Sequence, residues 1–347
     1  MWSPQDAVPE PFDPEYLSAY QARASFAGVP QRRWDAAEPG EVVILGAPFD
    51  WGASHRPGAR FGPKAIREAD YLGPDGRRPH LTAGLDPLVE LPVVDAGDVP
   101  VMPGYMEESL RNIEAAVHSI TSCGAIPLVL GGDHTIALPD ATGIARSLGF
   151  GQVAVVHFDA HADTGETQMG MLLGHGTPMR RLIESGAVPG HRFTQIGLRG
   201  YWPDQETLSW MRQQGMHSYF MQDCVRRGLD AVVNEAVGLV TGGGAGHDPA
   251  KGSFLSIDID VVDPSAAPGT GTPEPGGLTA RQLLDTVRRL GRELHVVGAE
   301  VVEVCPVYDA PADLTAALAN RVVLELCTGI AERRGAGQGA ATLSPPR

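Results

Sequence analysis

The chain has 347 residues, of which 43% are hydrophobic and 20% charged, a composition typical of a globular protein with a sizeable core. A formal net charge of −15 argues against a nucleic-acid partner, which would require a basic surface. No apolar run approaches the roughly 18 residues of a membrane span, and four cysteines without a CxxC pair favour reduced thiols over a disulfide framework. We therefore expect a cytoplasmic protein without nucleic-acid or membrane partners.

One domain is expected between two loose ends. Residues 1–40 and 332–347 are rich in Pro, Gly and Ala without periodicity, which predicts an N-terminal arm, a single domain over residues 41–331 and a flexible C-terminal tail. Short apolar runs predict strands over residues 41–48, 127–132, 153–159, 192–199, 253–260 and 294–304. Helical spacing appears over residues 106–124 and 279–294, with Thr279 as the second N-cap. Such apolar strands are typical of a sheet covered on both faces, so we expect an α/β fold with three αβα layers and a mostly parallel central sheet.

Two glycine-rich segments lack a nucleotide-binding motif. Residues 241–252 (TGGGAGHDPAKG) do not have the GKS/T ending of a P-loop and are expected to form a flexible surface insertion. Residues 268–277 (PGTGTPEPGG) follow a strand, but Glu274 occupies the third glycine position of GxGxxG. A dinucleotide site is therefore not expected.

Acidic and histidine side chains gather where the predicted strands end. Alternate side chains of an extended segment share a face, so Asp159, His161 and Asp163 should project together at the end of VAVVHFD. Asp258 and Asp260 share a side in the same way at the end of SFLSIDID. A single acid at such a place would usually cap a helix or a turn, but this many clustered carboxylates would repel one another without cations. The pattern indicates a metal site.

A third strand, PLVLGG, ends in Asp133-His134, and the spacing gives no reason to prefer one of these two residues as a ligand. Ligands of parallel α/β sheets bind outside the carboxyl ends of the strands, so the three strand ends should share one cluster. Its four aspartates balance two divalent ions. Asp and His ligands without thiolate suit manganese best, with nickel or cobalt possible.

Several ordered motifs resemble those of the ureohydrolases, the arginase and agmatinase family. They are GGDHTIALP (131–139), FDAHADT (158–164), HGTPM (175–179), SIDIDVVDPSAAPGTGTPEPGGLT (256–279) and VVEVCP (301–306). The stretch GAPFDWGASHRPGARFGPKAIR (46–67) resembles the agmatinase branch. Because the resemblance runs from about Val42 to Ala331, it implies an arginase-like fold and one catalytic domain over residues 41–331.

The resemblance also implies roles for particular residues. Its six ligands for two Mn²⁺ ions fall on His134, Asp159, His161, Asp163, Asp258 and Asp260, with Asp159 and Asp258 bridging. His175 matches the proton-shuttle histidine of the family, and Glu303 matches the acid that pairs with a guanidinium group. We expect both, together with Asp163, to be catalytic, and His175 and Glu303 to contact the substrate.

Several residues near these motifs are expected to have structural roles. His157 lies within its strand and is expected to be a buried, hydrogen-bonded histidine and not a ligand. Asp133, Asp263 and Glu300 are expected to have structural roles. Cys305 could be the nucleophile of a thiol-based amidinohydrolase, although most such strand cysteines are inert.

The residues that read the amino-acid end of arginine in arginase-type members are missing. Gly165 stands two places after Asp163, and Gly200 follows the strand that ends in IGLR, so arginine is disfavoured. The substrate tail should instead meet the loops 165–175, with Met169 and Met171, and 200–204, with Tyr201 and Trp202; our candidate contacts are Met171 and Trp202. Arg56 or Arg199 could receive the carboxylate of a guanidino acid.

These expectations combine into a function. The chain is predicted to be a dinuclear-metal amidinohydrolase that cleaves a small cationic guanidino compound, agmatine or 4-guanidinobutyrate, to urea and an amine. The family implies a homotrimer or homohexamer. The alternatives are a catalytically silent metal-binding homologue that serves as a partner subunit, and a hydrolase of another guanidine.

Overall fold

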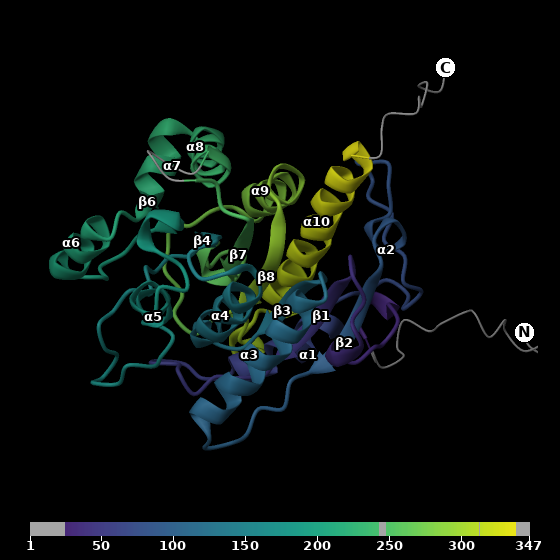
Figure 1. The fold of residues 1–347 in the computed structure, drawn as a ribbon, viewed down its shortest axis with the longest axis horizontal. Helices are drawn as coiled ribbons and strands as arrows, with labels where there is room; N and C mark the ends of the chain where they lie inside the picture. The colour runs from purple at the N-terminus through teal and green to yellow at the C-terminus, as the bar shows by residue number, and fades with distance from the viewer. Residues whose placement is uncertain (1–24, 243–247, 312, 338–347) are drawn as a thin grey trace, which may run out of the picture.

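A central sheet of eight parallel strands organises the computed structural model (Figure 1), which describes residues 25–242, 248–311 and 313–337. The strands are β1 (Val42–Ala47), β2 (Val93–Asp98), β3 (Ile126–Gly131), β4 (Val153–Phe158), β5 (Phe193–Leu198), β6 (His217–Phe220), β7 (Gly252–Asp258) and β8 (Val296–Val302). Their order in the sheet is β2-β1-β3-β8-β7-β4-β5-β6, and each neighbouring pair is parallel. All six strands predicted from apolar runs are therefore present.

Helices cover both faces of the sheet. The helices are α1 (Gly62–Glu68), α2 (Pro87–Glu90), α3 (Met106–Ser122), α4 (Ala137–Leu148), α5 (Pro178–Glu184), α6 (Gln205–Gln213), α7 (Met221–Arg227), α8 (Leu229–Gly242), α9 (Ala280–Glu293) and α10 (Leu314–Gly337). Alternate residues of β1 enter two separate cores: Ile44 packs with residues of α9 and α10, and Leu45 packs with residues of α3 and α4. This confirms the three-layer α/β fold.

Thr279 caps α9 as its sequence predicts. Its hydroxyl accepts a hydrogen bond from the backbone N–H of Gln282, while the Gln282 side chain accepts one from the N–H of Thr279. Helix α9 packs along α10, and this is the most extensive contact between two helices of the fold. By length and composition, helix α10 could cross a membrane. However, 78% of its most apolar stretch is buried inside the fold, as expected of a core helix.

The two ends of the described chain are held by contacts that composition does not reveal. Helix α10 continues to Gly337, past the boundary expected at residue 331, because Glu332 pairs with Arg288 and the Arg334 guanidinium donates to the carbonyl of Gly40. At the other end, Phe26 is buried, and its N–H donates to the carboxylate of Asp95 in β2 at 2.7 Å. Residues 1–24, 338–347 and part of the expected insertion, 243–247, lie outside the described residues.

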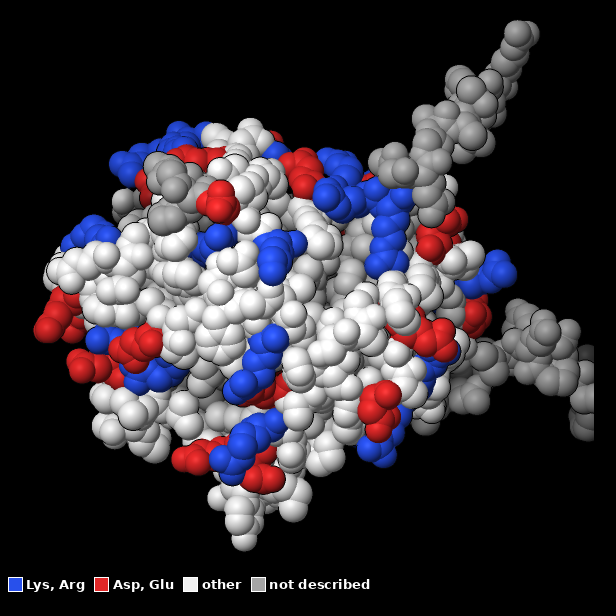
Figure 2. Space-filling view, viewed as in Figure 1, with Lys and Arg blue, Asp and Glu red and all other residues white. Residues whose placement is uncertain are grey.

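Acidic and basic side chains are intermingled on the face shown in Figure 2. Around α9, for example, Arg289 pairs with Glu293, and Arg292 lies near both Glu293 and Glu332. Both of these arginines are thus matched by nearby carboxylates.

Candidate metal centre and active site

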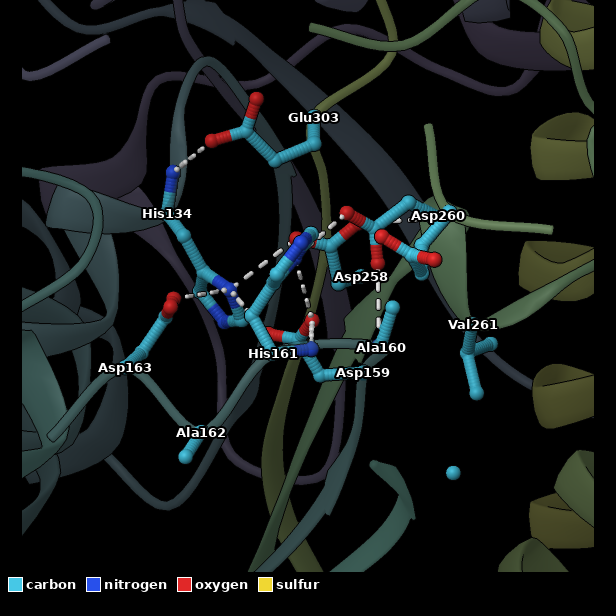
Figure 3. Close-up of polar contacts among 12 residues, drawn as sticks. His134, Asp159, Ala160, His161, Ala162, Asp163, Asp258, Asp260, Val261 and Glu303 are labelled. Atoms are coloured by element: carbon cyan, nitrogen blue, oxygen red, sulfur yellow. Dashed lines mark hydrogen bonds and ion pairs between the residues drawn. The ribbon is translucent and has the colours of Figure 1, made fainter. Parts of the chain in front are cut away.

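Four neighbouring strands bring acids and histidines to one edge of the sheet. Strands β3, β8, β7 and β4 are parallel, so their carboxyl ends meet there. His134 follows β3, Glu303 follows β8, Asp258 ends β7, and Asp159 follows β4. All four are buried, and Figure 3 shows them converging together with His161, Asp163 and Asp260. The six predicted metal ligands therefore lie in one cluster.

One group of side chains surrounds His134. Its Nδ1 atom lies 3.1 Å from Asp159 Oδ2, 3.0 Å from Asp163 Oδ2 and 3.2 Å from Asp258 Oδ2. The other ring nitrogen, Nε2, lies 2.8 Å from the Ser256 hydroxyl, which fixes the orientation of the ring. One nitrogen and three carboxylate oxygens thus face a single point.

A second group surrounds His161. Its Nδ1 atom lies 3.0 Å from Asp260 Oδ2 and 3.5 Å from Asp159 Oδ1. Asp159 belongs to both groups, so its carboxylate is placed to bridge two ions.

Backbone N–H groups aim these carboxylates. Asp159 Oδ1 accepts from His161 at 2.6 Å, Asp258 Oδ1 accepts from Asp260 at 2.8 Å, and Asp260 Oδ1 accepts from Ala160 at 3.1 Å. In each aspartate the second oxygen faces a histidine of the cluster. The backbone at the strand ends therefore orients the carboxylates toward the histidines of the cluster.

The donor set fits divalent cations. Nδ1 of His134 and Oδ2 of Asp260 are buried and have no hydrogen-bond partner among the described residues. Burial and the charges of Asp260 and Asp159 raise the pKa of Asp258 well above that of a free aspartate. Burial alone would lower the pKa of His134, but its three carboxylate neighbours outweigh burial and raise it. These are the features of a crowded anionic site that divalent cations would stabilise.

Two residues beside the cluster have other roles. His157 Nδ1 lies 3.0 Å from the side-chain nitrogen of Gln195, a donor, so Nδ1 accepts and Nε2 donates to Asp159 Oδ2 at 2.9 Å. His157 is thus a hydrogen-bonded support for Asp159, as expected. Asp133 accepts from the N–H groups of Gly52 and Thr135, so both of its oxygens are engaged, whereas His134 faces the cluster.

Two acidic residues of the site adopt strained backbone conformations. Asp163 has a φ of 52° and Glu303 a φ of 62°, in the left-handed region that costs a residue with a Cβ about 1–2 kcal/mol. The strain turns both carboxylates toward the pocket, where Asp163 meets His134 and Glu303 meets His175. Backbone strain of this kind is concentrated at functional sites.

Glu303 and His175 form a buried pair. His175 Nδ1 donates to Glu303 Oε1 at 2.9 Å, and the backbone N–H of His134 donates to the same oxygen at 2.8 Å. Burial alone would raise the pKa of Glu303, but His175 outweighs burial and lowers it. Burial alone would also lower the pKa of His175, but the charge and hydrogen bond of Glu303 outweigh burial and raise it to about 9. Glu303 is therefore ionised at neutral pH.

Ser54 completes the surroundings of His175, and the sequence analysis missed it. Its backbone nitrogen lies 3.1 Å and its hydroxyl oxygen 2.7 Å from His175 Nε2, and the hydroxyl can accept from Nε2 when the ring is protonated. The only signal was the position of Ser54 within the agmatinase-like stretch 46–67.

A pocket of about 390 Å³ opens above the cluster. Its wall consists of Ser54, His161, Asp163, Thr167, Gln168, Met169, His175, Gly176, Trp202, Asp258, Thr272 and Glu303. Trp202 therefore borders the pocket, as predicted, but Met169 takes the place expected for Met171, and the Tyr201 side chain is fully exposed. No lysine or arginine of the described residues lines the wall.

The remaining candidates are engaged elsewhere. The Arg199 guanidinium donates to backbone carbonyls of Asp260 and Glu274, and the Arg56 guanidinium lies over the Tyr308 ring at 5.4 Å. Burial raises the pKa of Cys305, so its thiol is neutral at physiological pH. A neutral thiol is a weak nucleophile, so this environment does not favour Cys305 as the nucleophile.

Two other acids have the structural roles expected of them. Asp263 accepts from the N–H groups of Ser265 and Gly276 in an exposed turn. Glu300 is buried within β8, 3.7 Å from the Nε2 atom of His134 and on the side of the ring away from the three carboxylates. Both acids are therefore separate from the proposed ligand set.

The parallel α/β sheet and the buried cluster define a metal-dependent hydrolase. The sequence profile of the Arginase family matches residues 40–329, and the chain belongs to the arginase family. It is 38% identical to guanidinopropionase from Pseudomonas aeruginosa, over 93% of this chain and 96% of that protein. It is 36% identical to agmatinase from Bacillus anthracis, over 84% and 92%.

Solved structures agree with this assignment. Proclavaminate amidino hydrolase from Streptomyces clavuligerus matches with a TM-score of 0.81 at 33% identity, over 91% of this chain and 99% of that one. Formiminoglutamase from Trypanosoma cruzi, solved with Mn²⁺, matches with a TM-score of 0.74 at 26% identity, over 87% and 99%.

Proposed function

We propose that the protein is an amidinohydrolase that converts a small guanidino compound to urea and an amine. The candidate substrates are agmatine, which would give putrescine, and 4-guanidinobutyrate, which would give 4-aminobutyrate. The observation that carries the proposal is the position of the Glu303–His175 pair, which shares one pocket with Asp163, Asp258 and His161 of the cluster.

The proposed cofactor is a pair of Mn²⁺ ions. His134, Asp159, Asp163 and Asp258 would hold one, and Asp159, His161 and Asp260, with Asp258 shared, would hold the other. Oxygen and imidazole donors without thiolate suit Mn²⁺, although Ni²⁺ and Co²⁺ accept such donors too, and a family structure carries Mn²⁺. Two such ions lower the pKa of water far enough to make it a nucleophile at neutral pH.

Glu303 would bind the guanidinium group. A buried, ionised carboxylate can accept two parallel N–H bonds from a planar guanidinium, which orients the carbon as well as binding the charge. The protein keeps this carboxylate in place through the N–H of His134, a residue of the metal cluster. Substrate and cluster are thus aligned through one short stretch of backbone.

His175 would supply the proton for the departing amine. In the reaction the oxygen of water forms a bond to the guanidinium carbon, the carbon–nitrogen bond to the tail breaks, and the amine nitrogen takes a proton. His175 holds its proton against Glu303 in the free protein. A guanidinium bound to Glu303 adds positive charge beside the imidazolium, which makes His175 a stronger acid during the reaction.

The wall above Glu303 fits a tail simpler than that of arginine. A Cβ at Gly165 would lie 2.9 Å from the carbonyl oxygen of Gly176 and 3.4 Å from the Trp202 ring, so a polar side chain at this position would crowd the backbone of the pocket wall. The wall contributed by Thr167, Met169 and Thr272 is uncharged. Methylene groups of an agmatine or guanidinobutyrate tail can pack there.

Urea release tests the proposal. The purified protein would be incubated with agmatine, 4-guanidinobutyrate, 3-guanidinopropionate and arginine, after loading with Mn²⁺ or treatment with a chelator. We expect urea from at least one of the first three, loss of activity on chelation and little turnover of arginine. Absence of urea from all of them would reject the proposal, and tight Mn²⁺ binding without turnover would instead indicate a silent homologue.

We also propose a homotrimer or homohexamer located in the cytoplasm. The support is the family membership and the four cysteines, which are all unpaired thiols. Light scattering coupled to gel filtration tests the assembly, and a monomer at micromolar concentration would contradict it. Fractionation of cells that express the tagged protein tests the location.

A further inference from the structure

The side chain of Gln168 joins two loops of the pocket. Its Nε2 donates to the carbonyl of Gly52 at 2.8 Å, and its Oε1 accepts from the backbone N–H of Gly176 at 2.8 Å. Gly52 is two residues from Ser54, and Gly176 directly follows His175. One carboxamide therefore links the segment that carries Ser54 to the segment that carries His175.

Gln168 is itself held by a tight turn. Its backbone pairs with Met171 through two hydrogen bonds of 2.8 and 2.9 Å, and the intervening Met169 and Gly170 have φ angles of 51° and 81°. Two consecutive left-handed residues are typical of a two-residue hairpin turn. The carboxamide thus projects from a defined point and not from a loose loop.

The glycines beside His175 accommodate this carboxamide. A Cβ at Gly174 would lie 2.7 Å from Gln168 Oε1, and one at Gly176 would lie 3.1 Å from it. The backbone N–H of His175 donates to the carbonyl of Gly52 at 3.1 Å, the same carbonyl that Gln168 binds. The two glycines let the carboxamide lie directly against the backbone of His175.

We propose that Gln168 is a positioning residue that sets the imidazole of His175 between Ser54 and Glu303. The ring contacts both, at 2.7 Å from the Ser54 hydroxyl and 2.9 Å from Glu303 Oε1. Because Ser54 and His175 lie on separate loops, the ring can keep both contacts only if the loops keep their spacing. The carboxamide holds this spacing together with the hydrogen bond from the His175 N–H to Gly52. The inference rests on the amidinohydrolase activity proposed above.

The test is a double-mutant cycle on the full-length protein loaded with Mn²⁺. Gln168→Met keeps the length of the side chain and removes both of its hydrogen bonds. We expect it to lower kcat by roughly 10- to 100-fold, as small misplacements of catalytic groups do, with KM and bound metal little changed. In a His175→Ala background the same substitution should change kcat by less than about twofold, because its target is absent. Gln213→Met, at an exposed position on α6, is the matched control and should behave as wild type.

Each result separates the possibilities. A Gln168→Met variant with normal kcat and raised KM would mean that Gln168 binds the substrate and would overturn the inference. Equal losses with and without His175 would mean a general structural effect and would overturn it too. If the His175→Ala background has no measurable turnover, the kcat and KM of the single variant decide alone. Absence of urea from the wild-type protein would instead reject the proposed function.

Discussion

The Glu303→Gln substitution removes one negative charge from the pocket and hardly changes the volume of the side chain. Glu303 is 1% exposed, and its Oε1 accepts from the N–H of His134. A glutamine carbonyl can keep that bond, but it cannot balance a guanidinium cation. Removing one partner of a buried ion pair costs about 3–5 kcal/mol, which corresponds to a loss in kcat/KM of roughly 10²- to 10⁴-fold.

Steady-state urea release and elemental analysis together check this prediction. Bound Mn²⁺ should stay at the wild-type level, because Glu303 belongs to neither group of clustered ligands. A variant with full metal content and kcat/KM within about tenfold of wild type would refute the pairing of Glu303 with the substrate cation. Loss of the metal would refute the separation of Glu303 from the cluster.

Three further predictions concern the metals and the thiol. Asp159→Asn should reduce bound Mn²⁺ from two ions to one or none, measured after dialysis, because Asp159 is shared by both groups; two retained ions would show that it does not bridge. Burial alone would lower the pKa of His161, but Asp260 and Asp159 raise it to about 12. The metal-free ring is therefore protonated at neutral pH. An ion must displace that proton, and Mn²⁺ affinity should be higher at about pH 8 than at about pH 6; equal affinities by calorimetry would contradict this. Cys305→Ala should leave kcat within about twofold of wild type, since its buried thiol is neutral, whereas abolished turnover with bound metal intact would revive a thiol mechanism.

The strands recognised from apolar runs are the ones with both faces covered. Those not recognised, β2 and β6, lie at the two edges of the sheet. The buried Asp95 within β2 forms an ion pair with Arg67, and most of β6 is only partly buried. Such strands do not need a continuous apolar run, so hydrophobicity alone could not reveal them.

The metal cluster was predictable because its residues follow strands directly. Strand parity and the common carboxyl edge bring Asp159, Asp258 and their neighbours together without any knowledge of loops. The pocket wall was less predictable. Which of Met169 and Met171 faces the substrate depends on the turn at residues 168–171, and the contact of Ser54 with His175 joins positions 121 residues apart. Neither follows from residue spacing.

The strands that carry the proposed metal-binding and catalytic groups occupy the middle of the sheet, with two more on each side. The loops proposed to meet the substrate tail leave the same sheet, and apart from Leu173 none of their described residues packs with its hydrophobic cores. Variation in those loops can therefore alter which guanidino compound is accepted while the reaction itself is preserved. The architecture separates the part of the enzyme that must stay constant from the part that is free to diversify.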